Sequence, residues 1–283
     1  MQLHVGMVGL GNLGAGMARR LTSTGHDVSG YDVVPDAVAA LGSHGVRAAA
    51  SVADLAAEVD LLCLVVSDAH QTEEVLFGTD GVVRGLAGRR GLVLLHSTIG
   101  PAAAQDLAHR CSEHGLTLVD APVSGGADAA EAGRLAIMIG CDGAIPGPAI
   151  QVFNALGGPT ERLGPVGAGQ AVKIANQMFA FTAQAALLEA LSLTSALGVE
   201  NQRTLDVFQR GLADSWVVRN WGFFDSLSAE YDQAGVPPES RPWNKDLKIA
   251  LDVCRSMDLD IPVTRTVESV IGRAIDRHGI NGR

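Results

Sequence analysis

Lysine is scarce in this chain of 283 residues, which uses it at three positions, 173, 245 and 248, beside 18 arginines. The formal net charge is −10, and the isoelectric point lies near 5.2. Basic blocks, zinc-like spacings and RNA-binding signatures are all missing from the sequence. The acidic balance argues against nucleic acid or an anionic membrane surface as a partner, and we predict no metal site.

Cysteine is rare and has no paired spacing. The four cysteines are scattered along the chain, at Cys63, Cys111, Cys141 and Cys254. This distribution is typical of buried thiols in a reducing compartment, not of a disulfide framework. The chain begins directly with a strand-like stretch, LHVGMVGL, so no signal peptide is predicted. We therefore expect a cytoplasmic protein.

An unbroken hydrophobic run of membrane-spanning length is also missing. The apolar stretch 174–197 is interrupted by four polar residues, Asn176, Gln177, Gln184 and Glu189. Such a pattern favours a helix buried inside protein, and we expect no membrane partner.

Short apolar runs alternate with amphipathic stretches in the first 160 or so residues. Strands are predicted at 3–9, 27–32, 60–66, 91–96, 116–120 and 135–140, with helices between them, for example at 14–24 and 101–114. Strands separated by helices indicate βαβ units in a doubly wound parallel sheet. We therefore predict an α/β domain over residues 1–162.

After Pro159 the pattern becomes helical. A long helix is predicted to begin within GPVGAGQAVKIANQMF (164–179) and to run to about Gly198. The segment 226–242 is polar and punctuated by proline and glycine, which predicts a loop. We expect residues 163–283 to form an all-helical domain for substrate binding and oligomerisation.

The stretch Gly9-Leu10-Gly11-Asn12-Leu13-Gly14, called here the glycine loop, follows the first predicted strand and opens a helix. In this G-x-G-x-x-G spacing, Gly9 permits a tight turn and Gly11 lets a pyrophosphate approach the backbone. Gly14 allows close packing of the helix on the strand, and the helix N-terminus offers N–H groups to phosphate. The motif predicts a dinucleotide-binding domain of Rossmann type.

Asp32 ends the second predicted strand, 18 residues after Gly14. A carboxylate there can accept hydrogen bonds from the adenosine ribose, and it would repel a 2′-phosphate. The next residues are Val33, Val34 and Pro35, with no arginine among them. The sequence therefore favours NAD as the cofactor, with NADP possible.

Five stretches, in order along the chain, resemble the β-hydroxyacid dehydrogenase family, which includes 3-hydroxyisobutyrate dehydrogenase and tartronate semialdehyde reductase. They are GLGNLGAGMARRL, HSTIGP (96–101), DAPVSGGADAAEAGRLAIMIG (120–140), GAGQAVKIANQM (167–178) and KDLKIAL (245–251). In the family these hold the cofactor loop, the nicotinamide contact, the substrate motif, the catalytic lysine and a late lysine. The resemblance implies an NAD(P)-dependent oxidoreductase acting on a β-hydroxy acid.

The resemblance also implies roles for particular residues. Lys173 would be the catalytic acid/base, with Asn176 and Gln177 helping to bind and orient the substrate. Ser124, Gly125 and Gly126 would hold the substrate carboxylate. Thr98 would contact the nicotinamide end of the cofactor, and Val66 and Ser67 would meet the cofactor at the end of the family's fourth strand. Lys245 would approach the cofactor or the substrate from the helical domain.

A lysine can act as a base only if its pKa falls from about 10.4 toward the working pH. Burial disfavours the ammonium form and so lowers the pKa. The positive end of the helix dipole would add a smaller effect, about 0.3–1 kcal/mol. Lys173, Asn176 and Gln177 stand at i, i+3 and i+4 and should share one helix face.

The stretch 213–227, ADSWVVRNWGFFDSL, departs from the family and is rich in aromatic residues in a chain with 4% aromatics. One interpretation is a core or subunit contact. The other is that Trp216 and Trp243 line a pocket for a larger, more apolar substrate. Two alternative functions follow: an imine reductase-like enzyme, or a non-catalytic cofactor-binding scaffold.

We also expect a homodimer or homotetramer, because a long exposed apolar helix needs covering.

Overall fold

The computed structural model describes residues 2–281, which divide into two compact units, Met1–Lys173 and Ile174–Arg283. The division falls inside the long helix α9 (Ala168–Ala196), eleven residues after the boundary predicted from the sequence. Each unit has its own hydrophobic core, and the two are described separately below.

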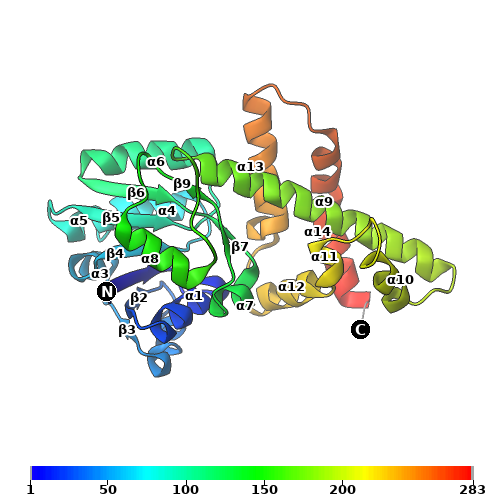
Figure 1. Ribbon diagram of the computed structural model, residues 1–283, viewed down its shortest axis with the longest axis horizontal. Helices are drawn as coiled ribbons and strands as arrows, with labels where there is room; N and C mark the ends of the chain where they lie inside the picture. The colour runs from blue at the N-terminus through cyan, green and yellow to red at the C-terminus, as the bar shows by residue number, and fades with distance from the viewer. Residues whose placement is uncertain (1, 282–283) are drawn as a thin grey trace. The chain divides into compact units, whose positions relative to one another are not determined.

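The first unit is built on a twisted sheet whose strands run in the order β10-β9-β6-β5-β4-β1-β2-β3 (Figure 1). The strands are β1 (His4–Val8), β2 (Asp27–Tyr31), β3 (Val46–Ala48), β4 (Leu61–Leu64), β5 (Gly91–Leu95), β6 (Leu116–Asp120), β9 (Ile139–Gly140) and β10 (Arg162–Gly164). Pairing is parallel except between β6 and β9. The order 3-2-1-4-5-6 within it is that of the doubly wound dinucleotide-binding fold, which confirms the predicted fold class.

Alternate residues of the strands enter two different cores, because successive side chains point to opposite faces of a sheet. Val5 and Met7 of β1 join the core beneath α1 (Asn12–Ser23) and α8 (Gly147–Leu156). Val8 joins the core on the other face. That second core lies beneath α3 (Val52–Glu58), α4 (Ala69–Phe77), α5 (Val82–Leu86) and α6 (Pro101–Glu113).

The remaining elements of this unit are short. They are α2 (Pro35–Ala39), the 3₁₀ turn Gly42–His44, α7 (Gly126–Glu131), and a separate two-stranded sheet of β7 (Val123–Ser124) and β8 (Ala136–Ile137). The strand predicted at 135–140 is therefore wrong as a single strand, because its two halves, β8 and β9, belong to different sheets. The four cysteines are buried thiols, as predicted.

The second unit is helical throughout its described part. Its helices are the later turns of α9, then α10 (Asn201–Phe208), α11 (Trp216–Arg219), α12 (Phe223–Gln233), α13 (Pro242–Ser256) and α14 (Pro262–Asn281), with a 3₁₀ turn at Pro238–Ser240. The loop predicted at 226–242 is corrected, since α12 extends to Gln233. Phe224 and Ser228 are buried at i and i+4 on α12, so packing of one face outweighs the polar composition of the other.

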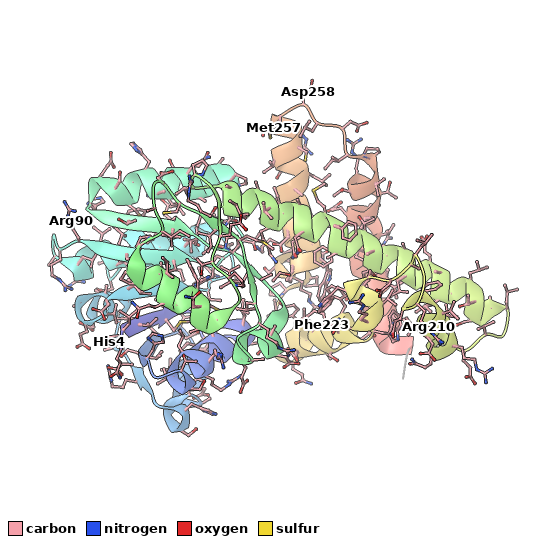
Figure 2. All side chains as sticks on the ribbon, in the orientation of Figure 1. His4, Arg90, Arg210, Phe223, Met257 and Asp258 are labelled. Carbon is pink, nitrogen blue, oxygen red and sulfur yellow. The ribbon has the colours of Figure 1, made fainter. Side chains whose placement is uncertain are left out.

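The aromatic residues of 213–243 mostly form the core of this unit. Trp243 is fully buried, and its ring packs against Phe224 and Tyr231 at centroid distances of 6.3 and 5.7 Å. Trp216 is half exposed and meets Phe223, which is labelled in Figure 2, edge to face at 4.9 Å. The interpretation as core is thus confirmed for Trp243. The alternative, in which Trp216 and Trp243 line a pocket, is therefore wrong for Trp243.

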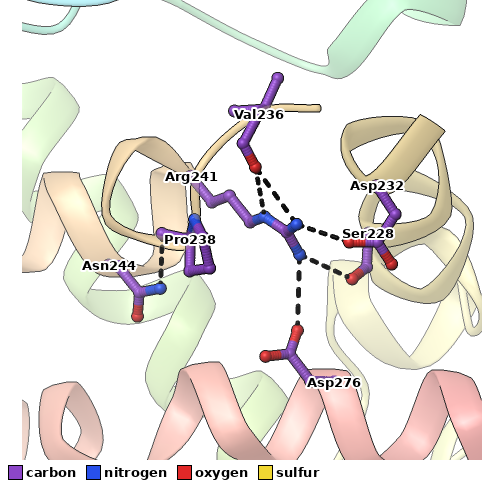
Figure 3. Close-up of polar contacts among 7 residues, drawn as sticks. All are labelled: Ser228, Asp232, Val236, Pro238, Arg241, Asn244 and Asp276. Carbon is purple, nitrogen blue, oxygen red and sulfur yellow. Dashed lines mark hydrogen bonds and ion pairs between the residues drawn. The ribbon is translucent and has the colours of Figure 1, made fainter. Parts of the chain in front are cut away.

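Arg241 connects three parts of the second unit (Figure 3). Its guanidinium donates to Asp232 Oδ1 at 2.5 Å, to Ser228 Oγ at 3.4 Å and to the carbonyl oxygen of Val236, and it pairs with Asp276 at 3.6 Å. These partners lie on α12, on the 234–241 connection and on α14. The backbone carbonyl of Arg241 accepts the N–H of Lys245 at 2.9 Å, so the same residue anchors the first turn of α13.

The helix α9 has two opposite stripes of unusual character. Four polar side chains are buried along one stripe, Gln170, Lys173, Gln177 and Gln184. The opposite stripe exposes apolar side chains, Val172, Phe179 and Leu193. By length and composition α9 would also pass for a membrane span, with a mean hydropathy of 1.2 over 18 residues. Only 22% of that window is buried, so the expectation of a helix buried inside protein holds for the polar stripe alone.

Candidate active site

The glycine loop has the geometry that its three glycines predict. Gly9 has φ of +90°, and a Cβ there would lie 2.5 Å from the carbonyl oxygen of Val65. A Cβ at Gly14 would collide with the carbonyl oxygen of Gly9. At Gly11, the N-cap of α1, a Cβ would meet nothing within 4 Å. The loop therefore leaves open space for a pyrophosphate at the N-terminus of α1.

Asp32 is held in place by the loop it was predicted to serve. Its Oδ2 accepts the N–H of Leu10 at 2.6 Å, and its Oδ1 accepts the N–H of Val34 at 2.8 Å. Both contacts fix the carboxylate at the end of β2, directly beside the glycine loop. A fixed negative charge at this position can accept hydrogen bonds from ribose hydroxyls and repels an added phosphate.

The ends of β4 and β5 meet beside the loop. The N–H of Val66 donates to Ser97 Oγ at 3.0 Å, and the N–H of Ser67 donates to Gln71 Oε1 at 3.0 Å. Thr98 follows Ser97 directly. From β1 the sheet continues to β2 and β3 on one side, and from its neighbour β4 it continues to β5 and β6 on the other side. The carboxyl ends of β1 and β4 therefore mark the topological switch point where open α/β sheets bind ligands.

Ser124, Gly125 and Gly126 connect β7 to α7. Gly125 has φ of +138° and Gly126 has φ of +77°, which L side chains rarely adopt. Ser124 pairs with Ala136 across the small sheet, so its backbone position is fixed. The segment combines a hydroxyl with the backbone of two glycines, a composition that suits an anion-binding turn.

Lys173 lies in the second turn of α9 with 7% of its surface exposed. At the same helix end the carboxylate of Asp120 accepts the N–H groups of Gly167 and Gln170 at 3.0 and 3.1 Å. The assistance that the helix dipole would give to deprotonation of Lys173 stays a prediction from the sequence.

In the second unit, Asn176, Gln177 and Lys245 are joined through Asp246. Asn176 Nδ2 donates to Gln177 Oε1 at 3.1 Å, and Gln177 Nε2 donates to Asp246 Oδ2 at 2.7 Å. Lys245 Nζ pairs with the other carboxylate oxygen, Oδ1, at 2.9 Å. Asp246 is itself 2% exposed. The three predicted residues of this unit thus form one polar chain, and Lys248 is exposed.

The other predicted residues all belong to the first unit: the glycine loop, Asp32, Val66, Ser67, Thr98, Ser124–Gly126 and Lys173. Sequence reasoning missed Asp120, Gln170 and Asp246, which hold these residues in place. Asp120 and Gln170 were visible inside the quoted motifs, but nothing in the sequence showed that they bond to each other. Within residues 2–281, no cluster of three or more histidine, cysteine or carboxylate side chains could hold a metal ion.

Comparison with known families matches both halves of the chain. Residues 4–167 match the model of the NAD-binding domain of 6-phosphogluconate dehydrogenase. Residues 167–282 match the model described as NAD-binding of NADP-dependent 3-hydroxyisobutyrate dehydrogenase. The two matches meet just before the first turn of α9.

Individual relatives agree with this assignment. The chain is 33% identical to L-threonate dehydrogenase of Cupriavidus necator over 265 residues, which covers 93% of this chain and 88% of that protein. It is 32% identical to NAD-dependent L-serine dehydrogenase of Pseudomonas aeruginosa, over 82% of this chain and 79% of that protein.

A solved structure shows the same fold. The 3-hydroxyisobutyrate dehydrogenase of Salmonella typhimurium superposes with a TM-score of 0.81 at 31% identity, covering 98% of this chain and 95% of the other. With the glycine loop at the switch point, the buried Lys173 and these matches over both halves, the chain belongs to the β-hydroxyacid dehydrogenase family as an NAD(P)-dependent oxidoreductase.

Proposed function

We propose that this protein oxidises the hydroxyl of a short β-hydroxy acid with NAD⁺, and that Lys173 is the general acid/base. The observation that carries the proposal is the burial of Lys173 in the same compact unit as Thr98 and Ser124–Gly126. A buried lysine is displaced toward its neutral form, which is the form that can accept a proton.

The residues present fit a dinucleotide. The open side of Gly11 and the N-terminus of α1 would hold the pyrophosphate, and Asp32 would accept hydrogen bonds from the adenosine ribose. Val66, Ser67 and Thr98 would contact the nicotinamide end, and the cofactor role implied for Lys245 stays a prediction from the sequence. When bound, the nicotinamide accepts a hydride from the carbon that carries the hydroxyl.

The chain's own groups account for the rest of the reaction. Lys173 Nζ takes the hydroxyl proton while the hydrogen on the same carbon leaves as hydride with both electrons of the C–H bond. The product is a carbonyl, and the lysine becomes an ammonium. Ser124, Gly125 and Gly126 hold the substrate carboxylate away from the reacting carbon. Asn176 and Gln177 orient the substrate. In the reverse direction Lys173 returns the proton to the carbonyl oxygen.

The proposed substrate class rests on the relatives as well as on the turn. L-threonate, L-serine and 3-hydroxyisobutyrate, the compounds in the names of the relatives, all carry a carboxylate and a hydroxyl. A bulkier apolar substrate, as for an imine reductase-like enzyme, has lost support because Trp243 lies in the core. The presence of a buried Lys173 also argues against a scaffold without catalytic activity.

The test is NADH formation with a panel of hydroxy acids: L-serine, L-threonate, glycerate, 3-hydroxyisobutyrate and aryl analogues, each with NAD⁺ and with NADP⁺. We expect turnover of a small β-hydroxy acid, with kcat/KM at least about tenfold higher for NAD⁺ because a 2′-phosphate would meet Asp32. Activity confined to aryl substrates or to imines would overturn the proposed substrate class. A preference for NADP⁺ would overturn the assigned role of Asp32.

A further inference from the structure

Asp120 is a fully buried carboxylate at the end of β6. N–H donors reach both of its oxygens: the backbone of Gly167 and of Gln170 bind Oδ2, and the Gln170 side chain binds Oδ1 at 2.9 Å. Burial raises the pKa of Asp120 above its ordinary value, and the hydrogen bonds from Gln170, Gly167 and Gly169 offset only part of that rise. Since each contact needs an acceptor and none offers one, the geometry fits the ionised form.

This carboxylate serves as the N-terminal cap of α9. A helix usually caps itself with a side chain one residue before its first turn. The residue in that place is Gly167, which has φ of +95° and no side chain to offer. Asp120, 47 residues earlier in the chain, supplies the missing acceptor. The first turn of α9 is therefore fixed to the sheet and not only to its own backbone.

The side chain of Gln170 extends the connection to the segment 97–100. Its Oε1 accepts the N–H groups of Ile99 and Gly100 at 2.9 and 3.1 Å. Its Nε2 donates to the carbonyl oxygen of Ser97 at 2.9 Å and to Asp120. Two donors face one end of the amide and two acceptors face the other, so the amide has one permitted orientation.

Thr98 lies between the residues that Gln170 binds, and Lys173 lies one helical turn after Gln170 on the same face of α9. We propose that this Asp120–Gln170 bridge is the positioning device of the active site: it fixes the lysine's helix turn and the threonine's loop to one another through a single carboxylate–amide pair. The inference rests on the proposed role of Lys173. Neither Asp120 nor Gln170 needs to touch the substrate.

In the bridge, the carboxylate at position 120 only accepts hydrogen bonds, whereas the amide at position 170 both donates and accepts them. Exchanging the carboxylate and the amide between the two positions therefore tests the proposal. In Asp120→Asn, an amide can still accept the backbone N–H groups of α9, but its NH₂ then faces the NH₂ of Gln170. Turning the Gln170 amide over relieves that conflict and creates another, against the N–H groups of Ile99 and Gly100. The double variant Asp120→Asn/Gln170→Glu restores both contacts, because a carboxylate at 170 accepts from either side. It leaves only the carbonyl of Ser97 without its donor.

The experiment compares Asp120→Asn, Gln170→Met and the double variant with the wild type. Gln184→Met is the matched control, because Gln184 is buried on the same face of α9 fourteen residues further on. NADH titration counts cofactor-competent sites, and single-turnover hydride transfer is then measured per site. We expect the single bridge variants to lose about 10- to 100-fold in this rate, the usual cost of a small misplacement, with full site counts. The double variant should recover most of the loss, and the control should match the wild type.

The opposite results would overturn the bridge. A purely structural role predicts fewer competent sites with an unchanged rate per site, and no recovery in the double variant. If Gln170→Met does not fold, the comparison of Asp120→Asn with the double variant Asp120→Asn/Gln170→Glu decides between the two roles. Failure of the proposed function looks different: Lys173→Ala would then keep its rate, whatever the bridge variants do.

Discussion

His96 is a buried histidine directly after β5, and it is neutral at ordinary pH. Its Nδ1 donates to the carbonyl oxygen of Ala121 at 2.7 Å, whereas its Nε2 has no hydrogen-bond partner among the described residues. Burial lowers the pKa of His96 to about 4, although the bond to Ala121 acts in the other direction. A proton added at Nε2 would be a buried charge without an acceptor.

This histidine should make the fold sensitive to acid. Between pH 6.5 and 4 the unfolded chain binds a proton at His96 that the folded chain does not, so stability is full above about pH 6.5 and falls as the pH falls. From pH 7.5 to 4.5 the wild type should lose about 2–3 kcal/mol more unfolding free energy than His96→Asn. Denaturant unfolding followed by circular dichroism at both pH values measures the difference. Equal losses in the two proteins would contradict a buried neutral His96.

At the scale of the element, sequence patterns predicted the longer strands and helices within a residue or a few. The strands they missed, β3, β7 and β10, have two or three residues each, too few to show an alternation. Helix α12 was hidden by polar residues such as Ser226 and Glu230 on its exposed face. The contact between Asp120 and Gln170 spans 50 residues, and no local pattern encodes a contact of that range.

Arg241 should stabilise the helices of the second unit. It is 6% exposed, but its carboxylate partners Asp232 and Asp276 retain 67% and 45% of their side-chain exposure. Replacing the arginine therefore leaves no fully buried carboxylate without a partner. Arg241→Met should lower the unfolding free energy by about 1–3 kcal/mol through lost hydrogen bonds and packing. Arg255→Met on the same helix, which removes an exposed pair with Asp252, should cost less than about 0.5 kcal/mol.

Tryptophan fluorescence measures this directly, since all three tryptophans, Trp216, Trp221 and Trp243, lie in the second unit. Guanidinium unfolding of both variants and the wild type gives the two differences in free energy. Similar values for Arg241→Met and Arg255→Met would show that the contacts in Figure 3 contribute little.

At the scale of the whole molecule, α9 leaves an apolar stripe without cover. Of its most apolar 18-residue window only 22% is buried, and Phe179 on that stripe is 74% exposed. We propose that a second copy of the chain covers the stripe, because closed symmetric dimers are the commonest oligomers and tetramers follow. The location in the cytoplasm and the small carboxylate partner remain predictions from the sequence.

Sedimentation at micromolar concentration tests this assembly. The wild type should sediment as a dimer or tetramer, and Phe179→Asp should shift it toward the monomer because a charge would have to be buried. Leu212→Asp is the control, since Leu212 is fully exposed but lies outside α9. A monomeric wild type, or one recovered with membranes, would contradict the proposed cover.

The proposed mechanism depends on Lys173 as the proton-transferring group. The most direct test is the turnover number of Lys173→Ala with NAD⁺ and the best hydroxy acid, measured beside NADH binding. We predict a loss of about 10²- to 10⁴-fold in kcat, the usual contribution of a general acid/base, with NADH affinity unchanged because the glycine loop and Asp32 are untouched. Turnover close to that of the wild type would contradict the assigned role, and with it the mechanism proposed for this site.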